Sequence, residues 1–229
     1  MLRFAQIGSL RSWLTVAYRV VGAVLAISAA NALMEAGRLI NLLTGPAIPW
    51  YTLFAFGLSL ATLRWCDNGY EPLSTGQSSR RRALMIALLL GVGLAALGLI
   101  LTAHAPLRAG RVALPGEAEP APIFFHLAAS YTKAGTAGLV EEAVIRGLVQ
   151  LGLQTTIKPR WAEIIAGLEF VLLHGSQLKN PGELLLVSST ALVNGRLTAL
   201  TQSTRYAVIV HCVSNLGITS GILLFRALA

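Results

Sequence analysis

Charged side chains are scarce in this chain: Asp, Glu, Lys and Arg make up 12% of its 229 residues, against roughly 25% in a typical soluble domain. Hydrophobic residues make up 55%, the mean hydropathy is +0.66, and several apolar runs approach the length of a membrane span. These runs do not alternate apolar with polar residues, as membrane β-strands would. The scarcity of charge therefore predicts an all-α, polytopic integral membrane helix bundle.

Cysteine is also scarce, since Cys66 and Cys212 are the only two, and no C-x-x-C spacing indicates a metal or redox site. Both fall in or beside apolar segments, so we expect small buried residues. The N-terminus lacks a recognisable cleavage site, and its first apolar run carries Arg19. We therefore expect a retained helix at the N-terminus and not a cleaved signal peptide.

The net charge of +8 reflects basic residues that gather in short polar segments, as in Arg80-Arg81-Arg82 and in Lys158 with Arg160. Such clusters are typical of the cytoplasmic loops of membrane proteins. We therefore expect no nucleic-acid partner, and we expect the N-terminus to be cytoplasmic. The compact basic loops favour a prokaryotic plasma (inner) membrane as the location.

The apolar runs predict six to seven transmembrane helices. These cover about residues 14–34, 49–66, 83–103, 124–154, 162–178, 183–200 and 205–226. The polar stretch 67–82 should be a cytoplasmic loop, and 104–123 should be a loop on the other side. The length of the helix over 124–154 predicts a break or tilt near Lys133-Ala134-Gly135. Trp50, Tyr51 and Trp65 are expected to anchor the second helix at the interface.

The first polar pattern in the C-terminal part of the chain is Glu141-Glu142 followed by Arg146. Glu142 and Arg146 are four residues apart, so they share one helical face in the favourable Glu-to-Arg order. Glu141 points about 100° away, which leaves it without that partner and available as a general base. The alternative is a charge cluster that stabilises the bundle and carries no chemistry.

Two further patterns, Phe170 with His174 and His211 with Asn215, also place residues four apart on one helical face. Phe170 should pack beside the imidazole of His174 and limit its orientation. The imidazole of His211 and the amide of Asn215 could bind a developing oxyanion if they point into one cavity. Each could instead be a structural group that is hydrogen-bonded across helices. No Ser/His/Asp spacing supports a serine nucleophile.

Taken in order, the patterns E-E-x-x-x-R, F-x-x-x-H and H-x-x-x-N resemble the CPBP family, which holds CAAX prenyl endopeptidases and bacteriocin-processing proteins (also called Abi or type-2 CAAX peptidases). The resemblance covers about residues 120–226. It divides one membrane domain into N-terminal helices and loops, 1–119, and catalytic core helices, 120–229. It implies a glutamate-dependent intramembrane endopeptidase that acts on a membrane-associated or lipid-anchored protein or peptide.

The resemblance also implies a role for each motif residue. Glu141 matches the catalytic glutamate, and His174 matches its partner in activating water. His211 and Asn215 match the residues that hold the water and the oxyanion. The remaining motif positions would have a supporting structural role: Glu142, Arg146 and Phe170.

We expect no metal cofactor, although zinc held by Glu141, His174 and His211 is an open alternative. Two histidines and a carboxylate could bind zinc and leave one position open. The H-E-x-x-H pattern is absent, and the amide of Asn215 is a poor zinc ligand. We therefore favour the metal-free mechanism over a zinc-dependent membrane metallopeptidase.

Two other classes of protein also fit a polar core in a membrane bundle. One is a non-enzymatic immunity or regulatory protein, and the other is a small transporter with a proton relay. A transporter would favour paired repeats and broken helices, which the sequence does not display. The expected partners are the lipid bilayer and a membrane-anchored substrate, for which prenylated C-termini, bacteriocins, membrane peptides and C-terminal sorting segments all qualify.

Overall fold

A computed structural model of the protein describes residues 77–104, 123–175 and 179–228, together with scattered positions between 14 and 36. Within these residues the regular structure is helical and contains no strand, which confirms the all-α prediction. Among them, three helical stretches are long and apolar enough to cross a membrane: Arg80–Leu101, Pro181–Thr201 and Thr204–Leu224. The expected helix over 49–66 and its aromatic anchors lie outside the described residues, and the helix over 14–34 lies only partly within them.

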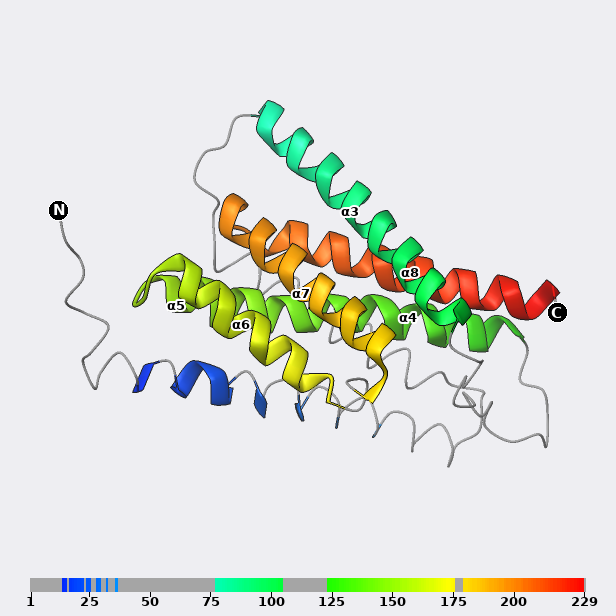
Figure 1. The fold of residues 1–229 in the computed structure, drawn as a ribbon, viewed down its shortest axis with the longest axis horizontal. Coiled ribbons are helices and arrows are strands. Elements are labelled where there is room, and N and C mark those ends of the chain that lie inside the picture. Colours follow the sequence, from blue (N-terminus) through cyan, green and yellow to red (C-terminus); the bar gives the residue numbers. More distant parts are fainter. Residues whose placement is uncertain are drawn as a thin grey trace.

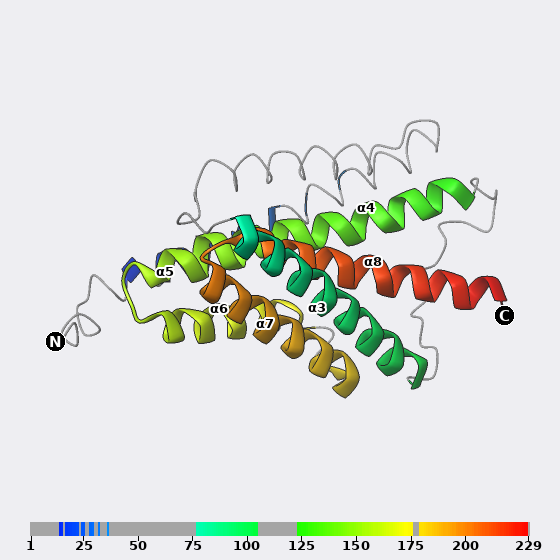
Figure 2. The ribbon, with the colours of Figure 1, turned by 90° about the horizontal axis from the view of Figure 1, so that it is seen from above.

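The described helices follow one another in a simple order along the chain. They are α3 (Gln77–His104), α4 (Ile123–Glu142), the π-helix η2 (Ala143–Leu151), α5 (Gly152–Gln154), α6 (Pro159–Leu173), α7 (Pro181–Thr201) and α8 (Thr204–Leu228). Figure 1 shows that α4, η2 and α5 form one long rod, while α6 returns beside it. Figure 2 shows α8 between α4 and α3, both of which it contacts.

The expected ends of α7 and α8 are confirmed to within two residues. Both ends of α7 carry a recognisable signal. Pro181 occupies the first turn of α7, where its missing N–H costs nothing. The side chain of Asn180 caps this end by accepting the backbone N–H of Gly182 at 2.9 Å. Gln202, in the left-handed region with φ of 51°, ends the helix.

Three expectations about helix bounds are wrong. The helix does not break near Lys133-Ala134-Gly135; the irregular part is η2, which begins directly after Glu142. A π-helical segment inside an α-helix is often found at a functional site. α3 already begins at Gln77, so the triple arginine at 80–82 lies on a helix and not in the loop predicted over 67–82.

The third wrong bound concerns α6, which was predicted over 162–178. It begins earlier, with Pro159 in its first turn, and it ends at Leu173. His174 has φ of −88° and ψ of 24°, so it has left the helix. His174 therefore belongs to the turn after α6, where its ring can face the neighbouring helices.

The two long helices α3 and α8 approach each other closely because small residues line their contact. A Cβ at Gly91 would lie 2.8 Å from the Cβ of Val213, and one at Gly217 would lie 2.6 Å from the Cβ of Ala95. In contrast, Gly93 has no neighbour within 4 Å. Close backbone approach at glycine is a common means of helix association in membranes, where lipid is as apolar as the side chains.

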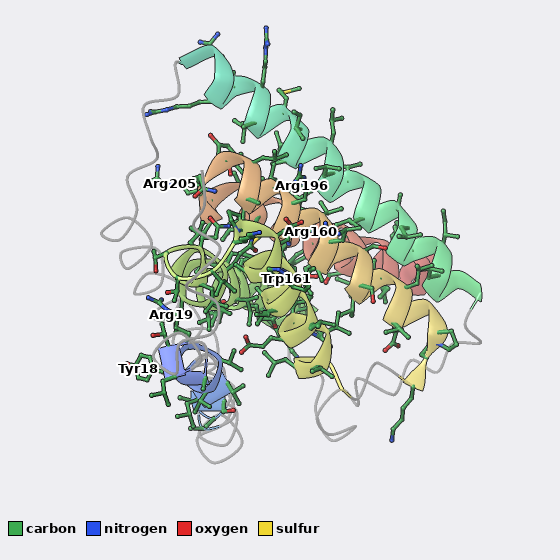
Figure 3. All side chains as sticks on the ribbon, turned by 60° about the vertical axis from the view of Figure 1, so that its left-hand side comes forward. Tyr18, Arg19, Arg160, Trp161, Arg196 and Arg205 are labelled. Atoms are coloured by element: carbon green, nitrogen blue, oxygen red, sulfur yellow. The ribbon has the colours of Figure 1, made fainter. Side chains whose placement is uncertain are left out.

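Exposed basic residues gather at one end of the bundle, where α6 begins, α7 ends and α8 begins. Arg160, Arg196 and Arg205 are seen there in Figure 3, with Trp161 beside them. Arg196 approaches Glu163 at 3.9 Å, a weak pair because the arginine is largely exposed. An exposed tryptophan among arginines is typical of a membrane interface, and excess Lys and Arg is typical of the cytoplasmic side.

Candidate active site

The carboxylate of Glu142 is the central acceptor of the buried polar groups. It is completely buried, and its Oε2 accepts a hydrogen bond from Arg146 Nε at 3.0 Å. Its Oε1 accepts from Asn194 Nδ2 at 2.8 Å and from His211 Nδ1 at 2.8 Å. The expected pairing of Glu142 with Arg146 is confirmed, and Glu142 also holds a histidine that the sequence assigned to oxyanion binding.

The guanidinium of Arg146 ties η2 to the backbone of α7. Its Nη2 donates to the carbonyl of Ala191 at 3.1 Å, and its Nη1 donates to Gln150 Oε1 at 3.2 Å. Gln150 Nε2 in turn donates to the carbonyl of Gly195 at 2.7 Å. Two backbone carbonyls of α7 thus accept hydrogen bonds from Arg146 and Gln150. A protein interior tolerates buried charges only when they are paired and hydrogen-bonded, and Glu142 and Arg146 meet this condition.

Glu141 has a different environment from its neighbour. Its Oε2 is buried and has no hydrogen-bond partner among the described residues, although the side chain keeps 23% of its surface exposed. The same oxygen lies 3.6 Å from His174 Nε2 and 4.0 Å from His211 Nε2. Both distances are too long for a direct hydrogen bond. Glu141 is therefore a carboxylate that faces two imidazoles without being bound to either of them.

The ring of His174 is held by Phe170, as expected. The ring centroids are 4.6 Å apart, and His174 Nδ1 bonds the carbonyl of Phe170 at 2.8 Å. A carbonyl can only accept, so Nδ1 carries the proton. Phe170 also lies edge-on to the ring of His211, with centroids 5.6 Å apart. One aromatic ring thus sets the orientation of both imidazoles towards Glu141.

Asn215 lies farther along the contact between α4 and α8. Its Nδ2 donates to the carbonyl of Ala134 at 3.2 Å. Ala134 precedes Glu141 by seven residues, about two turns or roughly 10 Å along the helix axis. The structure therefore brings Glu141, His174 and His211 together. Asn215 lies in α8, as His211 does, but its amide is bonded to the backbone of α4.

A glycine allows α8 to approach α4 at this place. A Cβ at Gly138 would lie 3.1 Å from the backbone nitrogen of Cys212 and 3.3 Å from the carbonyl carbon of His211. Cys212 Sγ lies 3.4 Å from the carbonyl oxygen of Gly135. Gly138 precedes Glu142 by one turn, so the close contact brings the start of the histidine motif to the Glu142 carboxylate.

Sequence reasoning missed two members of this cluster, Asn194 and Gln150. Gln150 could have been found, because Glu142, Arg146 and Gln150 repeat every fourth residue in an otherwise apolar run. Asn194 has no such signal in its own helix. Its partner lies 52 residues earlier, and only the fold brings the two together.

The atoms of the trio proposed for zinc lie farther apart than zinc ligands do. Ligand atoms around a tetrahedral zinc lie about 3.4 Å apart when each bond is about 2.0–2.1 Å. Glu141 Oε2 comes near this spacing to His174 Nε2, at 3.6 Å, but it is 4.0 Å from His211 Nε2. Among the described residues, no three His, Cys, Asp or Glu side chains are placed so that they could hold a metal ion.

Residues 122–217 match the family described as type II CAAX prenyl endopeptidase Rce1-like. The match covers somewhat less than half of the chain and includes all three polar patterns, which confirms the resemblance to the CPBP family of CAAX peptidases. It supports an intramembrane CAAX-type endopeptidase with a protein or peptide substrate. No curated protein and no solved structure matches the chain.

Proposed function

We propose that this protein hydrolyses a peptide bond in a membrane-associated or lipid-anchored protein or peptide, with Glu141 as the general base. The observation that carries the proposal is the buried Oε2 of Glu141, which has no partner among the described residues and faces His174 and His211 at 3.6 and 4.0 Å. A buried polar atom without a partner is unfavourable, so its presence in a folded protein calls for an explanation such as a catalytic role or a bound water. Separations of this size leave room for a bridging water between the carboxylate and the rings.

The hydrogen bonds of the two imidazoles support a specific role for each. Because His174 Nδ1 donates to the Phe170 carbonyl, its neutral ring presents a lone pair on Nε2 towards Glu141. A water between them can donate one hydrogen to Glu141 and the other to His174, which aims an oxygen lone pair at the substrate carbonyl. Glu141 then takes the proton as the water attacks.

His211 supports the oxyanion in this proposal. Its Nδ1 is engaged with Glu142, so Nε2 can donate to a substrate oxygen only when the ring is protonated. Arg146 already balances Glu142, and the charge of Glu141 is left to balance an imidazolium at His211. Asn215 can contribute beside it, because an amide carries two N–H donors and the bond to Ala134 uses one. Glu141 finally passes its proton to the leaving amine.

The location of the site and the matched family support the proposed substrate class. The site is built partly on helices that are long and apolar enough to cross a membrane, which supports a scissile bond in a segment held at the bilayer. The type II CAAX prenyl endopeptidase family points to a lipid-modified C-terminal segment as the first substrate class to examine. We place the basic end, which carries Arg160 and Arg205, on the cytoplasmic side.

Glu141→Gln tests the proposal, because it keeps the size of the side chain and removes the base. We expect proteolysis to be lost and the protein to remain folded and inserted. Membrane peptidomics of cells that express wild type or Glu141→Gln should show substrates that accumulate in the variant. Glu163→Gln, the same change outside the site, is the matched control and should cleave normally. Full activity of purified Glu141→Gln would remove Glu141 from the mechanism.

Metal analysis separates this mechanism from the zinc alternative. We expect purified protein to contain less than one zinc per chain and to keep its activity after prolonged chelation. Stoichiometric zinc, with activity lost on chelation and restored by the metal, would favour the metallopeptidase. Identical peptide profiles for wild type and Glu141→Gln would favour a non-enzymatic regulatory protein.

A further inference from the structure

We propose that Asn194 in α7 is a positioning residue that holds His211 in place through the carboxylate of Glu142. The inference rests on the proposed function. Asn194 is completely buried, and its Nδ2 donates to Glu142 Oε1 at 2.8 Å. The same oxygen accepts the Nδ1 of His211 at 2.8 Å. The amide and the imidazole therefore meet on one atom.

The arrangement of donors explains how an amide can act on a ring that it does not touch. Glu142 Oε2 is held by Arg146 Nε at 3.0 Å, while Oε1 is held by Asn194 and His211. The two donors on Oε1 together oppose the pull of the guanidinium on Oε2 and keep the carboxylate from rotating. If the Asn194 donor is removed, the carboxylate can turn towards a bidentate pairing with the guanidinium, the preferred arrangement of Arg with a carboxylate. His211 Nδ1 would then lose its fixed acceptor, and with it the fixed orientation of the ring.

The other end of the amide shows that packing does not account for Asn194. Its Oδ1 is buried and has no hydrogen-bond partner among the described residues. If the amide were flipped, Oδ1 would face the Glu142 carboxylate, and two acceptors would repel each other. The amide therefore directs Nδ2 at Glu142, and Oδ1 is left without a partner among the described residues. A buried carbonyl without a partner is unfavourable, and an aliphatic residue of the same size would avoid this. The bond from Nδ2 to Glu142 is therefore the contact that an asparagine supplies at this position.

Asn194→Leu separates positioning from structure, because leucine has a similar size and removes both amide groups. We expect kcat to fall roughly 10–100-fold, as for other residues that orient a catalytic group. KM should stay unchanged, since Asn194 does not contact the substrate. The thermal unfolding temperature should stay the same or rise. Thr198→Val is the matched control: Thr198 lies one turn later in α7, is completely buried, and its hydroxyl has no partner among the described residues. This variant should keep the wild-type kcat.

A spectroscopic measurement observes the ring directly. In protein labelled with ¹⁵N at histidine, NMR of the wild type should show His211 protonated at Nδ1, with the signal assigned by its loss in His211→Gln. The chain has four histidines, so the spectrum is tractable. Asn194→Leu should shift and broaden the Nδ1 signal of His211, because that proton loses its fixed acceptor, whereas Thr198→Val should keep the wild-type signal.

The outcomes are distinct. A wild-type kcat in folded Asn194→Leu, or an unchanged His211 signal together with loss of stability, would overturn the positioning role. If Asn194→Leu does not fold, Asn194→Ser provides the same test with a smaller side chain whose hydroxyl is too short to replace the amide. Activity that survives in Glu141→Gln would instead overturn the proposed function, whatever the result at Asn194.

Discussion

The contact of η2 with α7 is made by buried charges and amides, whereas the contact of α3 with α8 is made by glycines and aliphatic side chains. In the first, Arg146 and Gln150 reach two backbone carbonyls of α7. In the second, Gly91 and Gly98 of α3 receive the side chains of Val213 and Ile218. One contact depends on the donors and acceptors that meet, and the other depends on how closely two helices can approach.

The two contacts differ in how strictly they fix the position of one helix against the other. Apolar helices in lipid gain little from contact beyond close packing, so a glycine contact brings helices together but tolerates small shifts. A buried hydrogen-bonded charge penalises any arrangement that leaves it unpaired, so it selects one register. The candidate site lies against the charged contact. Glu142 belongs both to that contact and, through His211, to the site.

Removal of the guanidinium should break the charged contact and gives the largest expected effect. Arg146→Ala leaves Glu142 as a buried charge without its guanidinium partner, and breaking a buried pair costs about 3–5 kcal/mol of the free energy of unfolding. Unfolding measurements in detergent should show a much larger loss of the free energy of unfolding for Arg146→Ala than for Glu141→Gln. The exposed Arg160→Ala is the control and should unfold like the wild type. A Tm for Arg146→Ala equal to that of the wild type would show that the pair does not stabilise the bundle.

The sequence predicted the apolar helices and the pairing at the centre of the site because both depend on neighbours along one helix. Helical spacing alone places Glu142 against Arg146, and it places Phe170 against His174. The bounds of α7 and α8 could be read for the same reason, from Pro181 at one end and from the polar turn near residue 202.

The remaining features depend on contacts between helices, which one sequence does not display. The bond from Asn194 to Glu142 joins two helices, and the π-helix that begins at Ala143 replaces a break expected eight to ten residues earlier. That expectation relied on the length of the stretch 124–154 and placed the break near Gly135, a glycine that meets nothing within 4 Å. The glycine that does bring two helices together is Gly138, and its partner in α8 cannot be read from spacing along α4.

The glycine contact is tested by a matched pair of substitutions in α3. A Cβ at Gly91 would lie 2.8 Å from the Cβ of Val213 and 3.0 Å from the carbonyl oxygen of Val210, so a helix must move. We expect Gly91→Ala to lower the free energy of unfolding by about 1–3 kcal/mol, the usual cost of overpacking. Gly93→Ala meets nothing within 4 Å and should be neutral or gain up to about 1 kcal/mol from helix propensity. Equal unfolding temperatures for the two variants would contradict the packing role of Gly91.

The contact of α4 with α8 combines a close approach at glycine with a buried charged hydrogen bond. A small movement of α8 there should affect activity more than stability. A Cβ at Gly138 would lie 3.1 Å from the nitrogen of Cys212, so α8 must yield by a few tenths of an ångström. Helix propensity offsets much of that strain, and we expect the free energy of unfolding to change by less than about 1 kcal/mol.

The same movement displaces His211, whose carbonyl carbon would lie 3.3 Å from the new Cβ of Gly138→Ala. Small displacements of catalytic groups are costly, so kcat should fall roughly two- to tenfold. Gly135→Ala adds the same methyl group to α4 about one turn earlier, where nothing lies within 4 Å, and should keep the wild-type rate. The measurement is kcat of both variants beside their unfolding temperatures. A wild-type kcat in Gly138→Ala would show that the site tolerates this shift, and that the buried charges alone hold His211 in place.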